Sequence, residues 1–122
     1  MQLRLELFVA DIEKSRDFYV LILGFEIESA ESGGYTRLSF GDAAIALNPI
    51  ARIPKAHPSR QKPGEQAGLG HEINLGVDEI EGFYEAVQAA GGEIAEPLRK
   101  RPWGAQDFCL QDPDGNYIRI TT

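Results

Sequence analysis

The 122-residue chain has one cysteine, one tryptophan, two histidines and no long apolar run. The single cysteine, Cys109, excludes an internal disulfide and fits a reducing compartment, so we expect a cytoplasmic protein. No stretch approaches the roughly 20 apolar residues that span a bilayer. The segment Met1–Arg4 leads into a strand pattern without the layout of a signal peptide. We therefore expect no association with a membrane.

Positive charge is also scarce. Twelve lysines and arginines face nineteen aspartates and glutamates, which gives a net charge of -7. This balance argues against nucleic acid as the main partner. The chain also lacks a phosphate-binding loop, a dinucleotide fingerprint and a Ser-His-Asp arrangement. The expected partner is therefore a small molecule.

The first part of the chain alternates between apolar and polar residues and then becomes helical. Leu3, Leu5, Leu7 and Val9 alternate with Arg4, Glu6 and Phe8 and predict a strand with one apolar face. Asp11 then suits the N-cap of a helix that Gly24 ends. Further strands are expected over residues 25–30, 35–40 and 43–48.

Residues 49–70 hold four prolines and three glycines without a clear period, and we expect a linker or long loop there. After it the order of elements repeats. A strand over 73–77 and a helix over 79–90, followed by Gly91 and Gly92, precede strands at 93–98, 107–111 and 116–121. The predicted organisation is a first βαβββ module at 1–48, the linker at 49–70 and a second βαβββ module at 71–122, together one domain.

Two stretches carry a resemblance to a known family. "VADIEKSRDFYVLILGFEI" and "FCLQDPDGNYIRI" are similar to the first helix and the closing hairpin of the vicinal oxygen chelate superfamily. This superfamily includes glyoxalase I, extradiol dioxygenases, fosfomycin-resistance enzymes and bleomycin-resistance proteins. The resemblance implies an α+β fold in which two βαβββ modules form a curved mixed-sheet cup, usually completed in a dimer. We therefore expect a homodimer.

The resemblance also identifies where metal enzymes of the superfamily place ligands inside the cup. The matching positions on the first and last strands of each module are Arg4, Ala46, Glu72 and Arg119, with Asn48 near the second. Only Glu72 is a plausible ligand in this set. We therefore expect no metal and no other cofactor.

Strand alternation independently assigns charged residues to one sheet face. Arg4, Glu6 and Glu72 lie opposite the apolar residues of their strands, as does Arg119. This pattern alone is typical of an antiparallel sheet with one solvated side. If these side chains instead line a cup, desolvated charges must pair, and we expect an arginine–glutamate network in place of a metal.

The main interpretation is a small-molecule binder similar to the bleomycin-resistance branch, which sequesters drugs without chemistry. The ligand is expected to be polar, planar or zwitterionic. Trp103 could rim the pocket or serve as a half-buried loop anchor. The predicted ligand-binding residues are Arg4, Glu6, Phe8, Arg37, Asn48, Glu72, Asn74, Trp103, Asp107 and Arg119.

Two alternatives stay open. The chain could be a metal-dependent lyase or isomerase, or a dioxygenase-type enzyme, that uses Glu72, and Glu72 is also the one candidate for acid–base catalysis. It could instead be an interaction module with a closed cup. We expect His71 to lie at a strand boundary, His57 to be a mobile surface residue and Cys109 to be a small inner-face residue without a catalytic partner.

Overall fold

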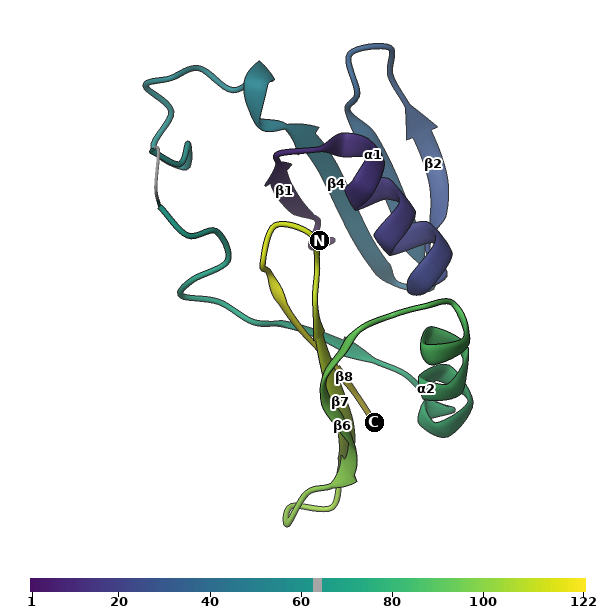
Figure 1. The fold of residues 1–122 in the computed structure, drawn as a ribbon. Helices are drawn as coiled ribbons and strands as arrows, with labels where there is room; N and C mark the ends of the chain where they lie inside the picture. The colour runs from purple at the N-terminus through teal and green to yellow at the C-terminus, as the bar shows by residue number, and fades with distance from the viewer. Residues whose placement is uncertain (63–64) are drawn as a thin grey trace. The chain divides into compact units, whose positions relative to one another are not determined.

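The computed structural model describes residues 1–62 and 65–122 and forms two compact units, residues 1–65 and 66–122. Residues 63 and 64, which belong to the predicted linker, lie outside the described residues. Each unit contains a four-stranded mixed sheet with helices (Figure 1). No helix within the described residues is long and apolar enough to cross a membrane.

The first unit has the strand order β1-β4-β3-β2, in which β1 is parallel to β4 and the other pairs are antiparallel. Its elements are β1 (Leu5–Val9), α1 (Ile12–Asp17), the π-helical segment η1 (Phe18–Ile22), β2 (Glu26–Ala30), β3 (Thr36–Phe40), β4 (Ala43–Pro49) and the 3₁₀ turn η2 (Ile50–Arg52).

The second unit repeats this plan with the strand order β5-β8-β7-β6, in which β5 is parallel to β8. Its elements are β5 (Ile73–Gly76), α2 (Ile80–Ala89), β6 (Ile94–Lys100), β7 (Gln106–Gln111) and β8 (Tyr117–Thr121). The α+β fold of two βαβββ modules is therefore confirmed. The cup and the boundaries of the linker stay predictions.

The first strand is shorter than its alternation predicted. β1 begins at Leu5, where its pairing with β4 starts, and Leu3 is 86% exposed. The prediction that the strand includes Leu3 was wrong, because the sheet register reaches no further back than Leu5. Leu7 and Val9 are buried as expected.

The first helix begins at the predicted N-cap and continues into the π-helical segment η1, whose turns are wider than those of an α-helix. The Asp11 carboxylate accepts hydrogen bonds from the backbone N–H groups of Glu13 and Lys14, each at 3.1 Å, which confirms the N-cap. The Leu23 N–H donates to the carbonyl of Phe18, five residues earlier. This wider turn brings Phe18 and Tyr19 into the core, where their rings meet edge to face.

In the second unit, the DPDG turn is held by its own side chains. The Asp112 carboxylate accepts from the backbone N–H groups of Asp114 and Asn116 and from the Asn116 amide. Gly68 packs so closely on this turn that a Cβ atom would lie 2.5 Å from the Gly115 carbonyl oxygen. His71 Nε2 lies 3.0 Å from Asn116 Oδ1, which ties the residue before Glu72 to the same turn.

The residues after β4 form a folded segment. The Arg60 guanidinium donates to the carbonyls of Ile50 and Ile53, and the Ile53 side chain is buried. His57 packs edge to face on Phe8, with ring centroids 5.4 Å apart, and accepts a hydrogen bond from the Ser59 N–H. The prediction that His57 is a mobile surface residue missed these contacts.

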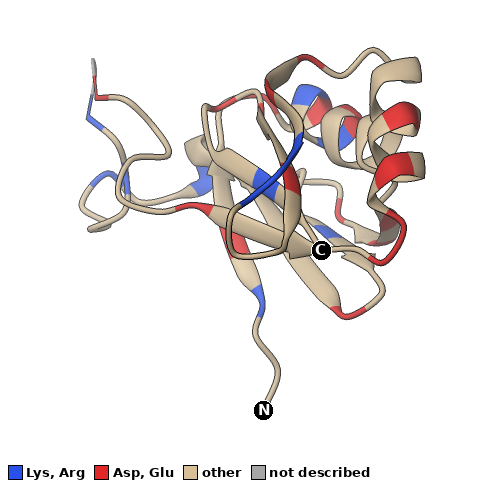
Figure 2. Ribbon diagram, turned by 90° about the horizontal axis from the view of Figure 1, so that it is seen from below, with Lys and Arg blue, Asp and Glu red and all other residues tan. Residues whose placement is uncertain are grey.

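The helix α2 carries part of the acidic excess, whereas the acidic residues of α1 are balanced by Lys14 and Arg16. Figure 2 shows acidic residues on α1 and α2, which include Glu13 on the first helix and Glu81 and Glu85 on the second. Glu13 and Glu81 lie in the first turns, where negative charge is favourable to the helix dipole.

Candidate functional site

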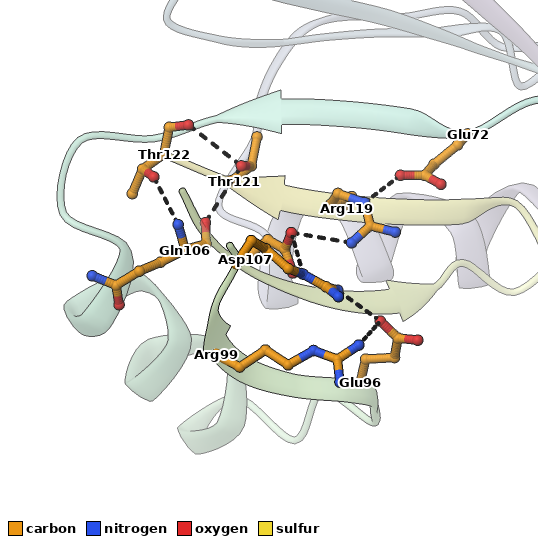
Figure 3. A network of polar contacts seen from close by, with 9 residues as sticks. Glu72, Glu96, Arg99, Gln106, Asp107, Arg119, Thr121 and Thr122 are labelled. Carbon is orange, nitrogen blue, oxygen red and sulfur yellow. Dashed lines mark hydrogen bonds and ion pairs between the residues drawn. The ribbon is translucent and has the colours of Figure 1, made fainter. Parts of the chain in front are cut away.

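The polar face of the second unit carries a row of residues that the sheet register aligns across three strands. Arg119 on β8 lies opposite Asn74 on β5 and opposite Cys109 on β7. Glu72 immediately precedes β5, and Asp107 begins the same face of β7. The predicted face assignments bring these side chains within reach of one another (Figure 3).

Arg119 binds two carboxylates from two neighbouring segments. Its Nε donates to Glu72 Oε1 at 2.5 Å, and its Nη1 lies 3.2 Å from Asp107 Oδ2. The Arg119 side chain is 25% exposed and that of Glu72 37%, whereas that of Asp107 is only 2% exposed. The arginine–glutamate pair that the sequence predicted is therefore present in this unit.

The same chain of charges continues to strand β6. The Arg101 guanidinium binds the buried Asp107 carboxylate at 2.9 Å and also lies 3.2 Å from Glu96. Arg99 pairs with the same Glu96 oxygen at 3.3 Å (Figure 3). We call this set the charge ladder; its members are Glu72, Arg119, Asp107, Arg101, Glu96 and Arg99.

Each carboxylate of the ladder has a guanidinium group beside it. The hydrogen bond to Glu72 raises the pKa of Arg119 above its ordinary value, although burial acts in the opposite direction. Asp107 is buried between two guanidinium groups, and such pairing is what a desolvated carboxylate requires. The ladder therefore compensates its charges with its own side chains.

Cys109 lies on this face next to Tyr117 and is completely buried. Burial raises the pKa of its thiol, although the hydrogen bond from Tyr117 lowers it in part. That hydrogen bond to Cys109, followed by burial, raises the pKa of Tyr117 to about 12. A buried thiol with a raised pKa is a poor nucleophile, which is consistent with the inner-face interpretation of Cys109.

The polar face of the first unit is arranged differently. The Glu6 carboxylate accepts from the Tyr35 hydroxyl at 3.3 Å and from Asn48 Nδ2 at 3.5 Å. Burial, and then the Glu6 charge, raise the pKa of Tyr35. Arg4 is exposed and forms no ion pair with Glu6 in the described part of the chain. Tyr35 and Asn48 thus take the role that the sequence had assigned to Arg4.

Two polar atoms on this face are buried without a partner. Among the residues that the structure describes, Arg37 Nε and Asn48 Oδ1 form no hydrogen bond and expose almost no surface, and the same holds for Arg16 Nε on α1. Each such atom ordinarily costs about 1–3 kcal/mol of stability when nothing satisfies it. The first unit therefore presents unsatisfied hydrogen-bonding groups, whereas the second unit joins its charges into the ladder.

Two further predicted residues, Trp103 and Asn74, lie beside the charge ladder. Trp103 is 72% exposed on the β6–β7 hairpin, so its alternative role as a half-buried anchor was wrong. The Arg101 guanidinium lies 5.8 Å from the Trp103 ring centroid and connects this ring to the charge ladder. Asn74 is exposed beside Arg119. The ligand-binding role of all ten residues stays a prediction.

Sequence reasoning missed Arg101. Strand alternation assigns no role to Arg101, which directly follows the last residue of β6. A signal was present, because an aspartate on the inner face needs a cationic partner and Arg101 lies only six residues before Asp107.

The donor groups present do not suit a divalent cation. Of the four positions that the resemblance matches to metal ligands, only Glu72 is a carboxylate, and it is bound to Arg119. Within residues 1–62 and 65–122, no three His, Cys, Asp or Glu side chains cluster so that they could hold a metal ion.

Comparisons with known proteins identify the family. The model of the Glyoxalase/Bleomycin resistance protein/Dioxygenase superfamily matches residues 2–120. A comparison with curated proteins found no match.

Solved structures share the fold at low sequence identity. TioX from Micromonospora sp. ML1 is 19% identical with a TM-score of 0.81, over 99% of this chain and 97% of that one. A glyoxalase/bleomycin resistance protein/dioxygenase from Nocardioides is 23% identical with a TM-score of 0.80, over 99% and 82%. Lactoylglutathione lyase from Agrobacterium tumefaciens is 17% identical with a TM-score of 0.73, over 99% and 92%. The chain belongs to the Glyoxalase/Bleomycin resistance protein/Dioxygenase superfamily.

Proposed function

We propose that the chain binds a small polar or planar molecule on the polar faces of its sheets and does so without a metal ion. In this it would act like the bleomycin-resistance proteins of the superfamily. The observation that carries the proposal is the pairing of Arg119 with both Glu72 and Asp107.

The pairing bears on metal binding because the Arg119 guanidinium is positively charged. A divalent cation at Glu72 would have to displace the Arg119 guanidinium or lie beside its permanent positive charge. Displacement would also remove one of the two cations that compensate the buried Asp107 carboxylate. Both routes disfavour metal binding relative to an organic ligand that accepts or donates hydrogen bonds.

Ligand-observed NMR in the presence of EDTA tests the proposal. L-tryptophan, benzoate and benzamide serve as planar probes of different charge. We expect at least one probe to bind saturably to the chelated protein and to be recovered unchanged. If no probe binds until a divalent metal is added, the proposal is wrong.

The alternative is an enzyme that uses Glu72. One observation favours it: the Glu72 side chain is 37% exposed, so its carboxylate is accessible. A Glu72→Gln substitution separates the two functions. It should abolish metal-dependent turnover in an enzyme, whereas in a binder it should alter probe affinity or stability only, with no turnover to lose.

We also propose that the chain forms a homodimer. Exposed apolar side chains in the first unit support this, since Leu21, Ile27 and Phe40 are each more than two-fifths exposed. Sedimentation velocity should give a single species of twice the chain mass. A species at the mass of one chain over the whole accessible concentration range would contradict a dimer.

A further inference from the structure

We propose, building on the ligand-binding function above, that Glu72 and Arg119 bind the head group of a zwitterionic ligand. This head group is a neighbouring ammonium and carboxylate, as in an α-amino acid. The ligand's carboxylate would accept from Arg119 Nη2, and its ammonium would donate to Glu72 Oε2. Both residues belong to the second unit, so the subsite lies within one sheet face.

The pair of Glu72 and Arg119 uses only part of the hydrogen-bonding capacity of each side chain. Arg119 Nε donates to Glu72 Oε1 at 2.5 Å, and Arg119 Nη1 lies 3.2 Å from Asp107 Oδ2. Arg119 Nη2 and Glu72 Oε2 form no hydrogen bond with any residue that the structure describes, and neither atom carries a dashed line in Figure 3. A guanidinium has five N–H donors and a carboxylate about four acceptor sites. A ligand can therefore bond to both side chains without breaking the pair.

These groups lie where a ligand can reach them from solution. The Arg119 side chain is 25% exposed and the Glu72 side chain 37%. Asn74, opposite Arg119 on the neighbouring strand, is also exposed and forms no side-chain hydrogen bond within residues 1–62 and 65–122. Its amide can donate to the ligand's carboxylate or accept from its ammonium.

Strand β5 leaves room beside the pair for the rest of the ligand. Gly76 follows Asn74 at the next position of the same face, about 6–7 Å along the strand, and has no side chain. A Cβ atom at Gly76 would meet no heavy atom of the described residues within 4 Å, apart from its chain neighbours. The body of a ligand whose head group is bound at Arg119 can therefore extend over Gly76.

Arg119 is held in position before a ligand binds. The Asp107 carboxylate, which contacts its Nη1, is 2% exposed and is itself bound by Arg101. Glu72 bonds to its Nε. With two anionic partners on one guanidinium, little additional ordering of this side chain is needed when a ligand binds.

The charges of this face favour a ligand that carries both signs. The charge ladder contains three guanidinium groups and three carboxylates, so it has no excess charge. A lone carboxylate at Arg119 would lie near the negative charge of Glu72, and a lone ammonium at Glu72 would lie near Arg119. A zwitterion places each of its charges beside the opposite one and makes two charge-assisted hydrogen bonds.

Ligand-observed NMR in EDTA with L-phenylalanine, 3-phenylpropanoate and phenethylamine tests the subsite. The three probes share a ring and a two-carbon chain and carry both charges, only the negative charge and only the positive charge. We expect L-phenylalanine to bind about five- to tenfold more tightly than either analogue. Equal affinities, tighter binding of an analogue, or no saturable binding of L-phenylalanine would overturn the proposal.

Substitutions locate the effect. In Glu72→Gln, 3-phenylpropanoate should bind at least as tightly as L-phenylalanine, because the negative charge that repels it is gone and the ammonium has lost its partner. A merely structural role of Glu72 would weaken both probes alike and leave their order unchanged, which would contradict the subsite. Dispersed spectra show that the variant is folded.

A second substitution tests the space over Gly76. Gly76→Leu should weaken L-phenylalanine binding about fivefold or more, because the new side chain occupies that space. Gly82→Leu on α2 is the matched control, since a Cβ atom there also has open space among the described residues, and it should leave the affinity unchanged. Equal effects of the two substitutions would contradict the placement of the ligand.

The outcomes distinguish this subsite from the proposed function. If benzoate, benzamide or a single-charge analogue binds in EDTA but L-phenylalanine is not preferred over its analogues, the subsite is wrong and the metal-free function holds. If no probe binds until a divalent metal is added, the metal-free function is wrong and the subsite is wrong with it.

Discussion

Arg119 is the residue on which the second unit's polar face depends, because it joins an accessible carboxylate to a buried one. Its partners differ in exposure: Glu72 retains 37% of its side-chain surface and Asp107 only 2%. The pair with Glu72 is accordingly worth little on its own. The contact with Asp107 matters more, since a buried carboxylate that loses a cation is strongly destabilising.

Removal of the Arg119 charge should therefore destabilise the protein more than removal of the Glu72 charge. We expect Arg119→Met to lower the free energy of unfolding by about 2–3 kcal/mol, with Arg101 limiting the loss. Glu72→Gln should cost no more than about 1 kcal/mol. Urea denaturation measures both, with Arg99→Met as an exposed control. Equal losses for the two substitutions would contradict this account.

Tyr117 gives a pH signature of the same face. The hydrogen bond to Cys109 and burial raise its pKa from 10.0 to about 12, so the folded chain holds this proton more tightly than the unfolded chain. The associated stability is fully present below pH 10 and is lost as pH rises from about 10 to 12.

Spectrophotometric titration of the folded protein should show a tyrosine that ionises near pH 12, and Tyr117→Phe should remove that transition. The variant should also lose stability less steeply over this interval. Tyr84→Phe serves as a control that retains the transition. A Tyr117→Phe curve identical to that of the unmodified chain would contradict the assignment.

At the scale of single residues, alternation predicted the faces of Arg119, Glu72 and Asp107 because strand geometry allows only two directions. The expected arginine–glutamate network did not include Arg101 or Glu96. Arg101 lies outside a strand, and its reach to Asp107 depends on how the β6–β7 hairpin bends. Such a bend is a tertiary property that no local pattern encodes.

Among the elements, the DPDG turn has a purely structural role beside the candidate site. Its side chains bond to one another and to His71, so the motif positions the residues around β8 and β5. It contributes no reactive group to the charge ladder. The turn's role in the site is thus positional.

Asp112→Ala should destabilise the protein by about 2–3 kcal/mol, because it removes three accepted hydrogen bonds and leaves buried donors of Asn116 unsatisfied. Thermal or urea denaturation measures the loss. Asp42→Ala, in the exposed turn between β3 and β4, should change stability by less than about 0.5 kcal/mol. Similar losses for both would show that the side-chain network of the turn is unimportant.

The existence and order of the elements followed from sequence, and their ends did not. Asp11 was recognised as an N-cap because its chemistry is local. The widening of the helix at Phe18 was not predictable from periodicity, since it depends on how the aromatic rings pack. Leu3 followed the strand pattern but lies before the point where sheet pairing begins.

For the whole molecule, duplication of one βαβββ plan has produced two polar faces with different chemistry. The second unit compensates its charges internally through the ladder, whereas the first leaves Arg37 and Asn48 unsatisfied. The pairing of Glu72 with Arg119 in the second unit is the feature from which we infer that a metal ion is disfavoured there. Sequence repetition predicted the shared plan, but these differences arise from side-chain pairing.

We propose that the Arg119 guanidinium takes the place of a metal ion at Glu72. Crystals soaked in manganese chloride and measured for anomalous scattering test it directly. We expect no anomalous peak at the Glu72 carboxylate and an intact pair between Glu72 and Arg119. A strong peak bound to Glu72, with the Arg119 guanidinium turned away, would contradict the account.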